Sequence, residues 1–140
     1  MRSLTSLELR QKLKKLGAGE RIATDLIHRA EQSGLIDERA IAEDHIRRGR
    51  ESRLVGRFLL RYELAGRGLD KSLIEEVLEE MYPESEELSV TRRFAESKLK
   101  YLGGLPSEVK HRRVAGALDR RGFTAENVAT VLRNLNLDAP

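Results

Sequence analysis

The stretch AGRGLD at residues 65–70 returns 54 residues later as DRRGFT at residues 119–124. Each stretch places a glycine, an apolar residue and a short polar residue in a row: Gly68, Leu69 and Asp70, then Gly122, Phe123 and Thr124. A glycine can end a helix in the left-handed conformation without a Cβ penalty, and the apolar residue after it can fold back onto that helix. Asp or Thr can then accept hydrogen bonds from the free N–H groups of the next helix. Each stretch therefore predicts that one helix ends and another begins.

The apolar residues around these two stretches repeat with them. At the same shift, five apolar positions coincide, with Leu60, Leu64, Ile74, Val77 and Leu78 falling on Val114, Leu118, Val128, Val131 and Leu132. Shifts of 51 and 53 residues lay Leu9, Leu13 and Gly17 on Leu60, Leu64 and Gly68, and Ile41, Ala42 and Ile46 on Phe94, Ala95 and Leu99. Chance recurrence of helix caps in an ordinary helical bundle would not carry the apolar positions along. We therefore predict one supersecondary unit used three times, with a core shared between neighbours.

The whole chain can be divided into copies of this unit. Apolar residues at helical spacing predict about eight helices, over residues 5–16, 20–33, 38–51, 53–67, 71–81, 85–102, 107–121 and 125–135. The predicted fold is all-α, with tandem three-helix repeats in an elongated, right-angled helical array. The repeats are predicted at residues 1–34, 35–82 and 83–140, and the first repeat is expected to lack its opening helix and keep only two.

The composition agrees with a helical protein and excludes several classes. Charged residues make up 35% of the chain and aromatic residues only 4%, which favours helices over a β-sandwich or barrel. The absence of cysteine removes disulfides and thiolate metal sites, and it fits an intracellular protein. No apolar stretch approaches the roughly 18 residues that cross a bilayer, and the N-terminus lacks the apolar run of a signal peptide. We therefore expect a cytoplasmic protein that does not bind membranes.

No motif in the sequence indicates catalysis or cofactor binding. The chain has no phosphate-binding loop and no pair of histidines at metal-ligand spacing. The lone G-x-G formed by Gly66 and Gly68 is interpreted as a helix end, and His45 as a partly buried histidine on an apolar stripe. The glutamates between residues 75 and 80 are interpreted as a solvated helix face. We therefore expect no enzymatic activity and assign no catalytic, cofactor-binding or metal-ligating residue.

Charge is distributed in alternating blocks, although the net charge is only +3. Residues 47–67 contain seven arginines, residues 71–87 contain seven glutamates, and residues 92–121 contain nine lysines and arginines. Such blocks predict faces of opposite sign, and a basic face can bind phosphates or an acidic protein surface. For any single residue, pairing with a neighbouring glutamate is the simpler interpretation. For the clusters as a set we predict a partner-binding surface, carried by Arg47, Arg48, Arg57, Arg61, Arg112 and Arg113; Arg57 and Arg61 are expected to be exposed on one helix face.

Four segments in a fixed order cover most of the chain: LELRQKL at 7–13, SGLIDERAIAEDHIRRGR at 33–50, GRFLLRYELAGRGLDKSLIEEVL at 56–78 and ALDRRGFTAENVATVL at 117–132. The most specific are GLID at 34–37 and the paired helix caps around Gly68 and Gly122. In this order and spacing the segments resemble the RecX family of RecA recombinase regulators. Two features depart from the family, which usually carries another helix before the first segment and often has Tyr at the position of Ile41.

The resemblance implies a regulatory protein of tandem three-helix repeats that binds the RecA filament on DNA. Such a protein lies in the groove of the filament and restrains strand exchange, ATP hydrolysis and co-protease activity, and so affects DNA repair, recombination and the SOS response. The expected partners are the RecA filament and single- or double-stranded DNA, and a monomer is expected. The residues also leave open a second function, that of a sequence-tolerant DNA-binding helical module. The spread of basic residues over several helices argues against base reading by one recognition helix, and the scarcity of aromatic residues argues against stacking on single strands.

Overall fold

The structure is a computed structural model that describes residues 3–138. These residues form eight α-helices and no β-strand, as predicted. The helices are α1 (Ser6–Lys15), α2 (Glu20–Gln32), α3 (Glu38–Arg48), α4 (Arg57–Gly66), α5 (Lys71–Met81), α6 (Glu84–Leu99), α7 (Ser107–Asp119) and α8 (Ala125–Asn134). A π-helical turn, Gly49–Arg53, follows α3, and a 3-10 turn, Lys100–Leu102, follows α6.

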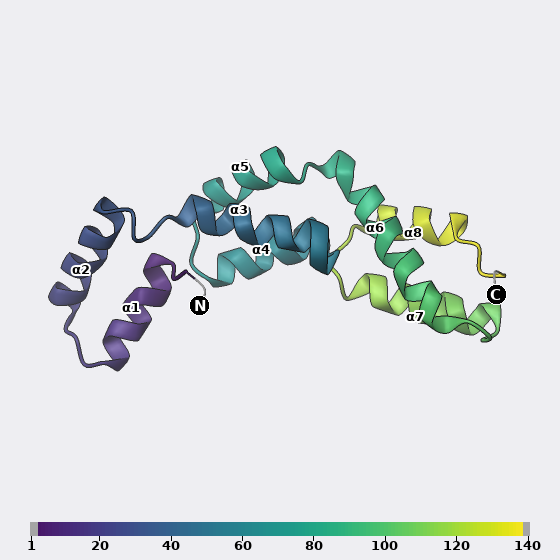
Figure 1. The fold of residues 1–140 in the computed structure, drawn as a ribbon, viewed down its shortest axis with the longest axis horizontal. Coiled ribbons are helices and arrows are strands. Elements are labelled where there is room, and N and C mark those ends of the chain that lie inside the picture. The colour runs from purple at the N-terminus through teal and green to yellow at the C-terminus, as the bar shows by residue number, and fades with distance from the viewer. Residues whose placement is uncertain (1–2, 139–140) are drawn as a thin grey trace.

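The helices form an elongated array of three groups (Figure 1). Helices α1 and α2 pack against each other at one end and lie across the long axis of the molecule. Helices α3, α4 and α5 pack together in the middle and run along that axis, and α6, α7 and α8 pack together at the other end. This grouping supports repeat boundaries after residues 34 and 82, which we propose for the chain.

Both predicted helix caps are confirmed. Gly68 and Gly122 have φ angles of +90° and +78°, in the left-handed region that glycine adopts without strain. The apolar residues that follow them, Leu69 and Phe123, are buried. The Asp70 side chain accepts a hydrogen bond from the N–H of Ser72, and the Thr124 hydroxyl accepts one from the N–H of Asn127. The two stretches that predicted the repeat are therefore the same structural device.

The predicted start of the fourth helix was wrong. A helix was expected to about residue 51 and a new one from residue 53; the helical path does continue through the π-helical turn to Arg53, but α4 begins only at Arg57. In between, Leu54 has a φ of +56°, an uncommon conformation for a residue with a side chain. The N–H of Gly56 donates to the Arg121 carbonyl oxygen at 2.7 Å, and a Cβ at Gly56 would collide with the backbone of Gly122. Contact with the next repeat, rather than local helix propensity, therefore determines the conformation of residues 54–56.

The middle and third groups of helices share one continuous core. The core extends from Ala42 on α3 to Val131 on α8, and Tyr82 lies fully buried within it. The Tyr82 hydroxyl donates to the Val55 carbonyl oxygen at 2.9 Å, so its one polar group is satisfied in an apolar setting. A core shared between these two repeats is what the repeat hypothesis predicted.

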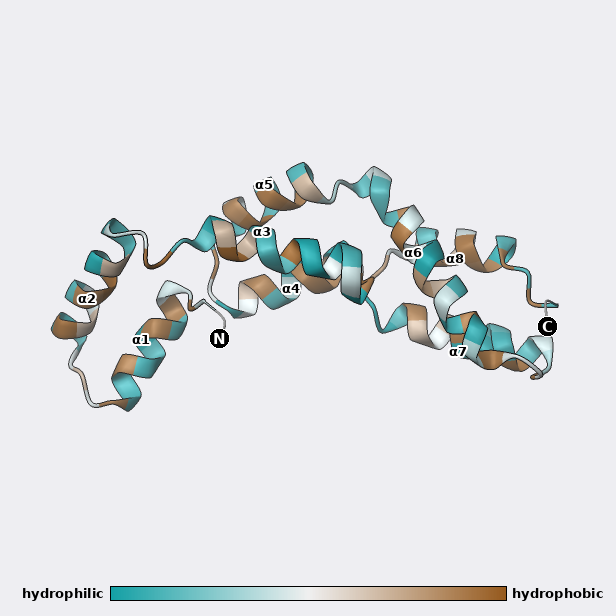
Figure 2. Ribbon diagram, viewed as in Figure 1, coloured by the Kyte–Doolittle hydropathy of each residue, from teal (hydrophilic) through white to brown (hydrophobic). Residues whose placement is uncertain are grey.

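The prediction of a shared core was wrong for α1 and α2. On these two helices only Ala23 and Ile27 are buried, and neither belongs to the continuous core. Leu16 and Ile22, which lie on the apolar stripes of this helix pair, are 76% and 60% exposed. Figure 2 shows brown, apolar bands on α1 and α2 at the end of the array where no third helix lies. Two helices alone cannot cover both of their apolar stripes.

Candidate partner-binding surface

Arginines of the middle repeat pair with glutamates of α5 and α6. Arg50 in the π-helical turn contacts Glu86 of α6 at 2.8 Å and donates to the Met81 carbonyl oxygen at 2.7 Å. Arg39 of α3 contacts Glu80 of α5 at 2.5 Å. The basic and acidic blocks of the sequence therefore meet within the middle repeat and at its junction with the third repeat, and they largely neutralise each other there. Ion pairs of this kind hold neighbouring helices in contact, and little net charge remains to attract a binding partner.

Arg57 and Arg61 belong to this internal network, and neither is exposed, contrary to the prediction. Only 12% of the Arg57 side chain is exposed, and its Nε donates to the Tyr82 carbonyl oxygen at 2.8 Å, where α5 has just ended. Arg61 is half-buried and forms a two-point ion pair with Glu75 of α5. The two arginines do share a helix face, but α5 lies against it.

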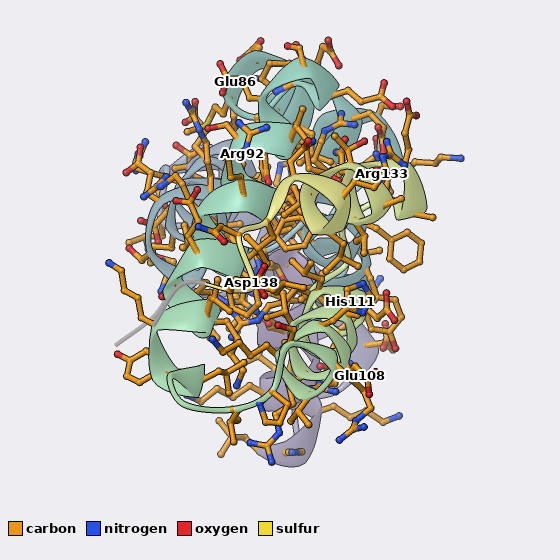
Figure 3. All side chains as sticks on the ribbon, turned by 90° about the vertical axis from the view of Figure 1, so that its right-hand side faces the viewer. Glu86, Arg92, Glu108, His111, Arg133 and Asp138 are labelled. Carbon is orange, nitrogen blue, oxygen red and sulfur yellow. The ribbon has the colours of Figure 1, made fainter. Side chains whose placement is uncertain are left out.

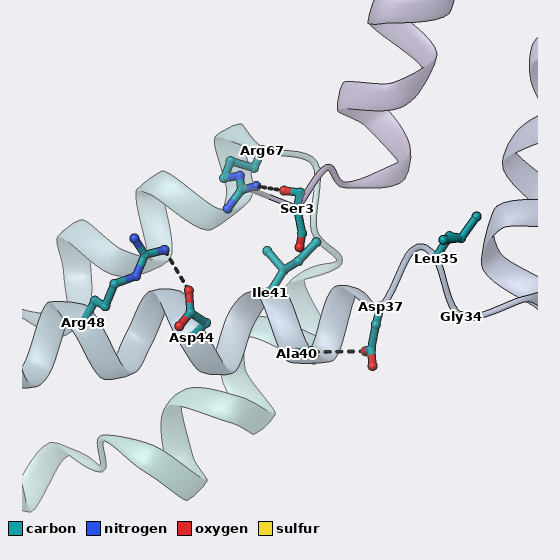
Figure 4. A pocket seen from close by; sticks show the side chains of 9 residues that line it. All are labelled: Ser3, Gly34, Leu35, Asp37, Ala40, Ile41, Asp44, Arg48 and Arg67. Carbon is teal, nitrogen blue, oxygen red and sulfur yellow. Dashed lines mark hydrogen bonds and ion pairs between the residues drawn. The ribbon is translucent and has the colours of Figure 1, made fainter. Parts of the chain in front are cut away.

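Arg47 and Arg48, at the end of α3, are both exposed. Arg48 contacts Asp44 at 2.9 Å, while Arg47 lies 3.9 Å from the same carboxylate. Arg48 also lines a cleft of about 600 Å³ beside the connection between α2 and α3 (Figure 4). In Figure 4 the guanidinium groups of Arg48 and Arg67 lie on the same side of α3, and Arg67 donates to the Ser3 carbonyl oxygen at 2.7 Å. The two exposed arginines thus share one carboxylate, so part of their positive charge is not neutralised.

Arg112 and Arg113, on α7, are exposed and differ from the arginines of the middle repeat. Within residues 3–138, no carboxylate lies within ion-pair distance of either. The same holds, over that range, for the other exposed or half-buried cations of the third basic block, which are Arg92, Arg93, Lys98, Lys100, Arg120 and Arg121. Lys110 is the exception, since it is buried and donates to the Leu137 carbonyl oxygen at 3.1 Å. The third repeat therefore carries many cations without an ion-pair partner, and within residues 3–138 the same is true of Lys12, Lys14 and Lys15 on α1.

The free end of the third repeat is not uniformly basic. At this end lie the acidic side chains of Glu108 and Asp138, which Figure 3 labels, and Asp138 accepts a hydrogen bond from the Ser107 hydroxyl at 2.8 Å. Acidic groups at the tip would repel phosphates, whereas Arg112 and Arg113 lie further along α7. The sides of the third repeat are thus better suited than its tip to contact an anionic partner.

His45 is a partly buried, hydrogen-bonded histidine, as predicted. Its Nε2 lies 2.9 Å from Glu63, which also forms a two-point ion pair with Arg53 at 2.7 and 2.8 Å. The Arg53 guanidinium, and after it the His45 ring, lower the pKa of the Glu63 carboxyl. No group of side chains in residues 3–138 has the arrangement needed to hold a metal ion. Across the same residues, no helix has the length and apolar character that a membrane span requires.

Sequence reasoning missed the exposed aromatic side chains. Phe58 and Tyr62, one turn apart on α4, are largely exposed, and so is Tyr101 after α6. The chain contains only three phenylalanines and three tyrosines, so half of its aromatic rings face solvent. Exposed aromatic residues are enriched at binding surfaces. The helical period of the apolar stripes could have indicated Phe58 and Tyr62, because both fall off the stripe formed by Leu60 and Leu64.

Several curated proteins are similar to the chain over most of its length. The regulatory protein RecX of Streptomyces coelicolor is 30% identical over 129 residues, which are 92% of this chain and 68% of that protein. The regulatory protein RecX of Trichlorobacter lovleyi is 30% identical over 128 residues, 89% of this chain and 82% of that protein. The regulatory protein RecX of Amycolatopsis mediterranei is 28% identical over 133 residues, 95% of this chain and 75% of that protein. The chain matches no protein-family model.

Two solved structures share the fold. The crystal structure of RecX from Lactobacillus salivarius superposes with a TM-score of 0.77 at 20% identity, covering 98% of this chain and 87% of that one. The crystal structure of a regulatory protein RecX gives a TM-score of 0.80 at 19% identity, covering 96% of this chain and 66% of that one. These relatives are described as regulatory proteins, which agrees with the absence of a catalytic motif in the sequence of this chain. The sequence similarity over most of the chain, on this helical-repeat fold, shows that the chain belongs to the RecX family of regulatory proteins.

Proposed function

We propose that this protein binds the RecA–DNA filament and inhibits its recombinase, ATPase and co-protease activities, and so modulates DNA repair and the SOS response. The observation that carries the proposal is the membership of the RecX family, seen in relatives that match nine-tenths of the chain. The protein acts without catalysis of its own, as a monomer, by occupying surface on the filament.

The contact surface is formed by exposed cations of successive repeats. Arg112 and Arg113 on α7 contribute most, because they have no carboxylate partner among residues 3–138, and Arg47 and Arg48 on α3 contribute next. Arg57 and Arg61 are left out of this surface, since their guanidinium groups are used by α5. An elongated array presents these cations at separated points, so that several weak charge contacts add up along a helical partner. Such binding weakens steeply as salt rises.

A second candidate function is that of a sequence-tolerant DNA-binding module. The observation that favours it is the set of third-repeat cations that have no ion-pair partner among residues 3–138, because such cations bind phosphates of any sequence. The two functions differ in what the protein binds most tightly. Titrating it against DNA alone, RecA alone and a preassembled RecA–DNA filament separates them. Filament binding that exceeds both others supports RecA regulation, and equal binding to bare DNA and filament favours the DNA-binding module.

A further inference from the structure

A cavity lies between the second half of α6 and the end of α7. It has a volume of about 300 Å³, and its lining includes Phe94, Ser97, Lys98, Tyr101, Arg120 and Arg121. The volume is at the lower end of the range of about 300–1,000 Å³ that small-molecule sites occupy. The lining contains three cations and no carboxylate.

The cations crowd together at this cavity without an acidic counterpart. The Arg121 guanidinium lies 4.3 Å from the centre of the Phe94 ring, and its Nη1 donates to the Arg53 carbonyl oxygen at 2.8 Å. Burial, together with the neighbouring charges of Arg53 and Arg120, lowers the pKa of Arg121. Like charges held this close repel each other, and a bound anion would relieve the repulsion. The positive charge around the cavity therefore favours the binding of a negatively charged group.

Tyr101 adds a flat, exposed ring beside these cations. The residue is 85% exposed, the largest exposed fraction among the bulky apolar and aromatic side chains of residues 3–138. It belongs to the short 3-10 turn that ends α6, next to Lys100 and one helical turn after Lys98. A ring held at the mouth of a basic cavity offers a stacking surface to any planar group attached to an anion. The scarcity of aromatic residues in the chain, which argued against stacking, therefore does not apply at this cavity.

We propose that this cavity binds a nucleotide, with the phosphate held by Lys98, Arg120 and Arg121 and the base stacked on Tyr101. A nucleotide combines an anion with a planar ring, the two features that the cavity matches. A carboxylate of an acidic peptide would satisfy the cations but would leave the tyrosine ring without a partner. The inference goes beyond both proposed functions, because it assigns a nucleotide to one cavity and adds base stacking on Tyr101, which neither of them uses. The nucleotide has two possible sources, a single-stranded nucleic acid or the free nucleotide pool.

The test uses the full chain and measures binding to three probes. The probes are a fluorescein-labelled 20-mer of thymidine, the same backbone with abasic sites in place of the bases, and ATP as a competitor. The parent protein is expected to bind the thymidine oligomer about tenfold more tightly than the abasic one, the size expected for stacking of a base on an aromatic ring. Displacement of the oligomer by ATP at comparable concentration identifies a free nucleotide as the ligand, and resistance to ATP identifies the single strand. Both results support a nucleotide site.

The variants separate stacking from charge. Tyr101→Ala is expected to remove the preference for the thymidine oligomer, and Tyr101→Phe to keep it, because only the ring is needed. Arg120→Gln is expected to weaken both oligomers equally. The matched controls are Tyr62→Ala, another exposed tyrosine on α4, and Arg133→Gln, another exposed cation of the third repeat, and both are expected to bind like the parent. The proposal is overturned if no probe binds, if Tyr101→Ala keeps the preference, or if the controls lose affinity as much as the cavity variants.

Discussion

Arg67 and Arg121 occupy equivalent positions at the two junctions between neighbouring groups of helices. The Arg67 carbonyl oxygen accepts from the Thr5 hydroxyl at 2.6 Å, and the Arg121 carbonyl oxygen accepts from the Gly56 N–H at 2.7 Å. Thr5 and Gly56 are the N-caps of α1 and α4, respectively. Each arginine therefore joins the helix end of one repeat to the helix start of the repeat before it.

The side chains of the two arginines reach back across the same junctions. Arg67 donates to the Ser3 carbonyl oxygen at 2.7 Å, and Arg121 to the Arg53 carbonyl oxygen at 2.8 Å. The junctions differ in what else holds the guanidinium. Arg67 forms a two-point ion pair with Glu8 at 3.0 Å, whereas Arg121 lies over the Phe94 ring. The first junction is thus mainly polar, while the second is reinforced by the continuous core.

Replacing the cap glycines tests the junctions. A valine at Gly34, where φ is +82° and nothing lies within 4 Å of a Cβ, is expected to cost about 1–2 kcal/mol from backbone strain alone. Gly122→Val is expected to cost clearly more, because its Cβ would lie 2.6 Å from the backbone nitrogen of Leu59. The free energy of unfolding in urea measures both variants. Equal costs at the two glycines would show that the close approach at Gly122 does not matter.

Glu87 is a buried carboxylate that links two helix N-termini. It is 1% exposed and accepts from the N–H of Arg57 at 3.2 Å and from the N–H of Thr124 at 2.9 Å. Glu87→Ala leaves these two N–H groups without an acceptor and is expected to destabilise the protein by about 2–4 kcal/mol. Glu96→Ala, on an exposed part of the same helix, is the control and is expected to change stability by less than about 0.5 kcal/mol.

Hydrogen exchange gives this prediction a second readout. In Glu87→Ala the amides of Arg57 and Thr124 are expected to lose protection more than the interior of α6. A loss of stability spread evenly over all helices, with no excess at these two amides, would contradict the capping role of Glu87.

Arg67→Ala is expected to detach the first helix pair without unfolding the rest. The ion pair with Glu8 and the bond to Ser3 would be lost, and α1 and α2 contribute nothing to the continuous core. Weakly packed segments open independently of the remainder. Amide exchange in α1 and α2 should therefore rise several-fold while exchange in α4 to α8 stays unchanged, with Arg21→Ala as an exposed control. Faster exchange throughout the chain would show that the first pair is an integral part of one cooperative unit.

Stability is expected to fall in acid partly through Glu63. Because Arg53 and His45 lower the pKa of its carboxyl in the folded protein, the unfolded chain takes up the proton first as pH decreases. The stabilisation is therefore complete above the ordinary pKa of 4.5 and is lost as pH falls through the lower, folded value. Glu63→Gln should flatten the decline in unfolding free energy below pH 4.5, and Glu126→Gln, an exposed residue of α8, should not. Parallel pH profiles for Glu63→Gln and the parent would exclude this contribution.

Helices and caps could be predicted from the sequence because they depend on neighbours in the chain. The period of the apolar residues and the glycines at 68 and 122 determine where helices form and end. The late start of α4 could not be predicted in this way, since it depends on contact between Gly56 and Gly122, which are far apart in the sequence. The local pattern also did not indicate that Leu16 is exposed, because its exposure depends on how few helices pack beside α1. Nor did it indicate which arginines form ion pairs with which glutamates.

The candidate site was harder to predict for the same reason. Arg57 and Arg112 look alike in sequence, each in a basic stretch at helical spacing. The Arg57 side chain donates a hydrogen bond to the backbone at the end of α5, whereas Arg112 has no carboxylate partner within the described part of the chain. Only the packing of the acidic helix α5 against α4 distinguishes the two.

The most direct test of the central claim is inhibition of ATP hydrolysis by a preassembled RecA–DNA filament. Arg112→Glu/Arg113→Glu is compared with the parent and with Lys14→Glu/Lys15→Glu, a matched double reversal at exposed lysines of α1. We predict that the parent inhibits hydrolysis, less so as salt rises, and that the α7 variant needs about tenfold more protein for the same inhibition while the α1 variant stays close to the parent. No inhibition by the parent, or equal inhibition by all three proteins across the salt series, would contradict the account.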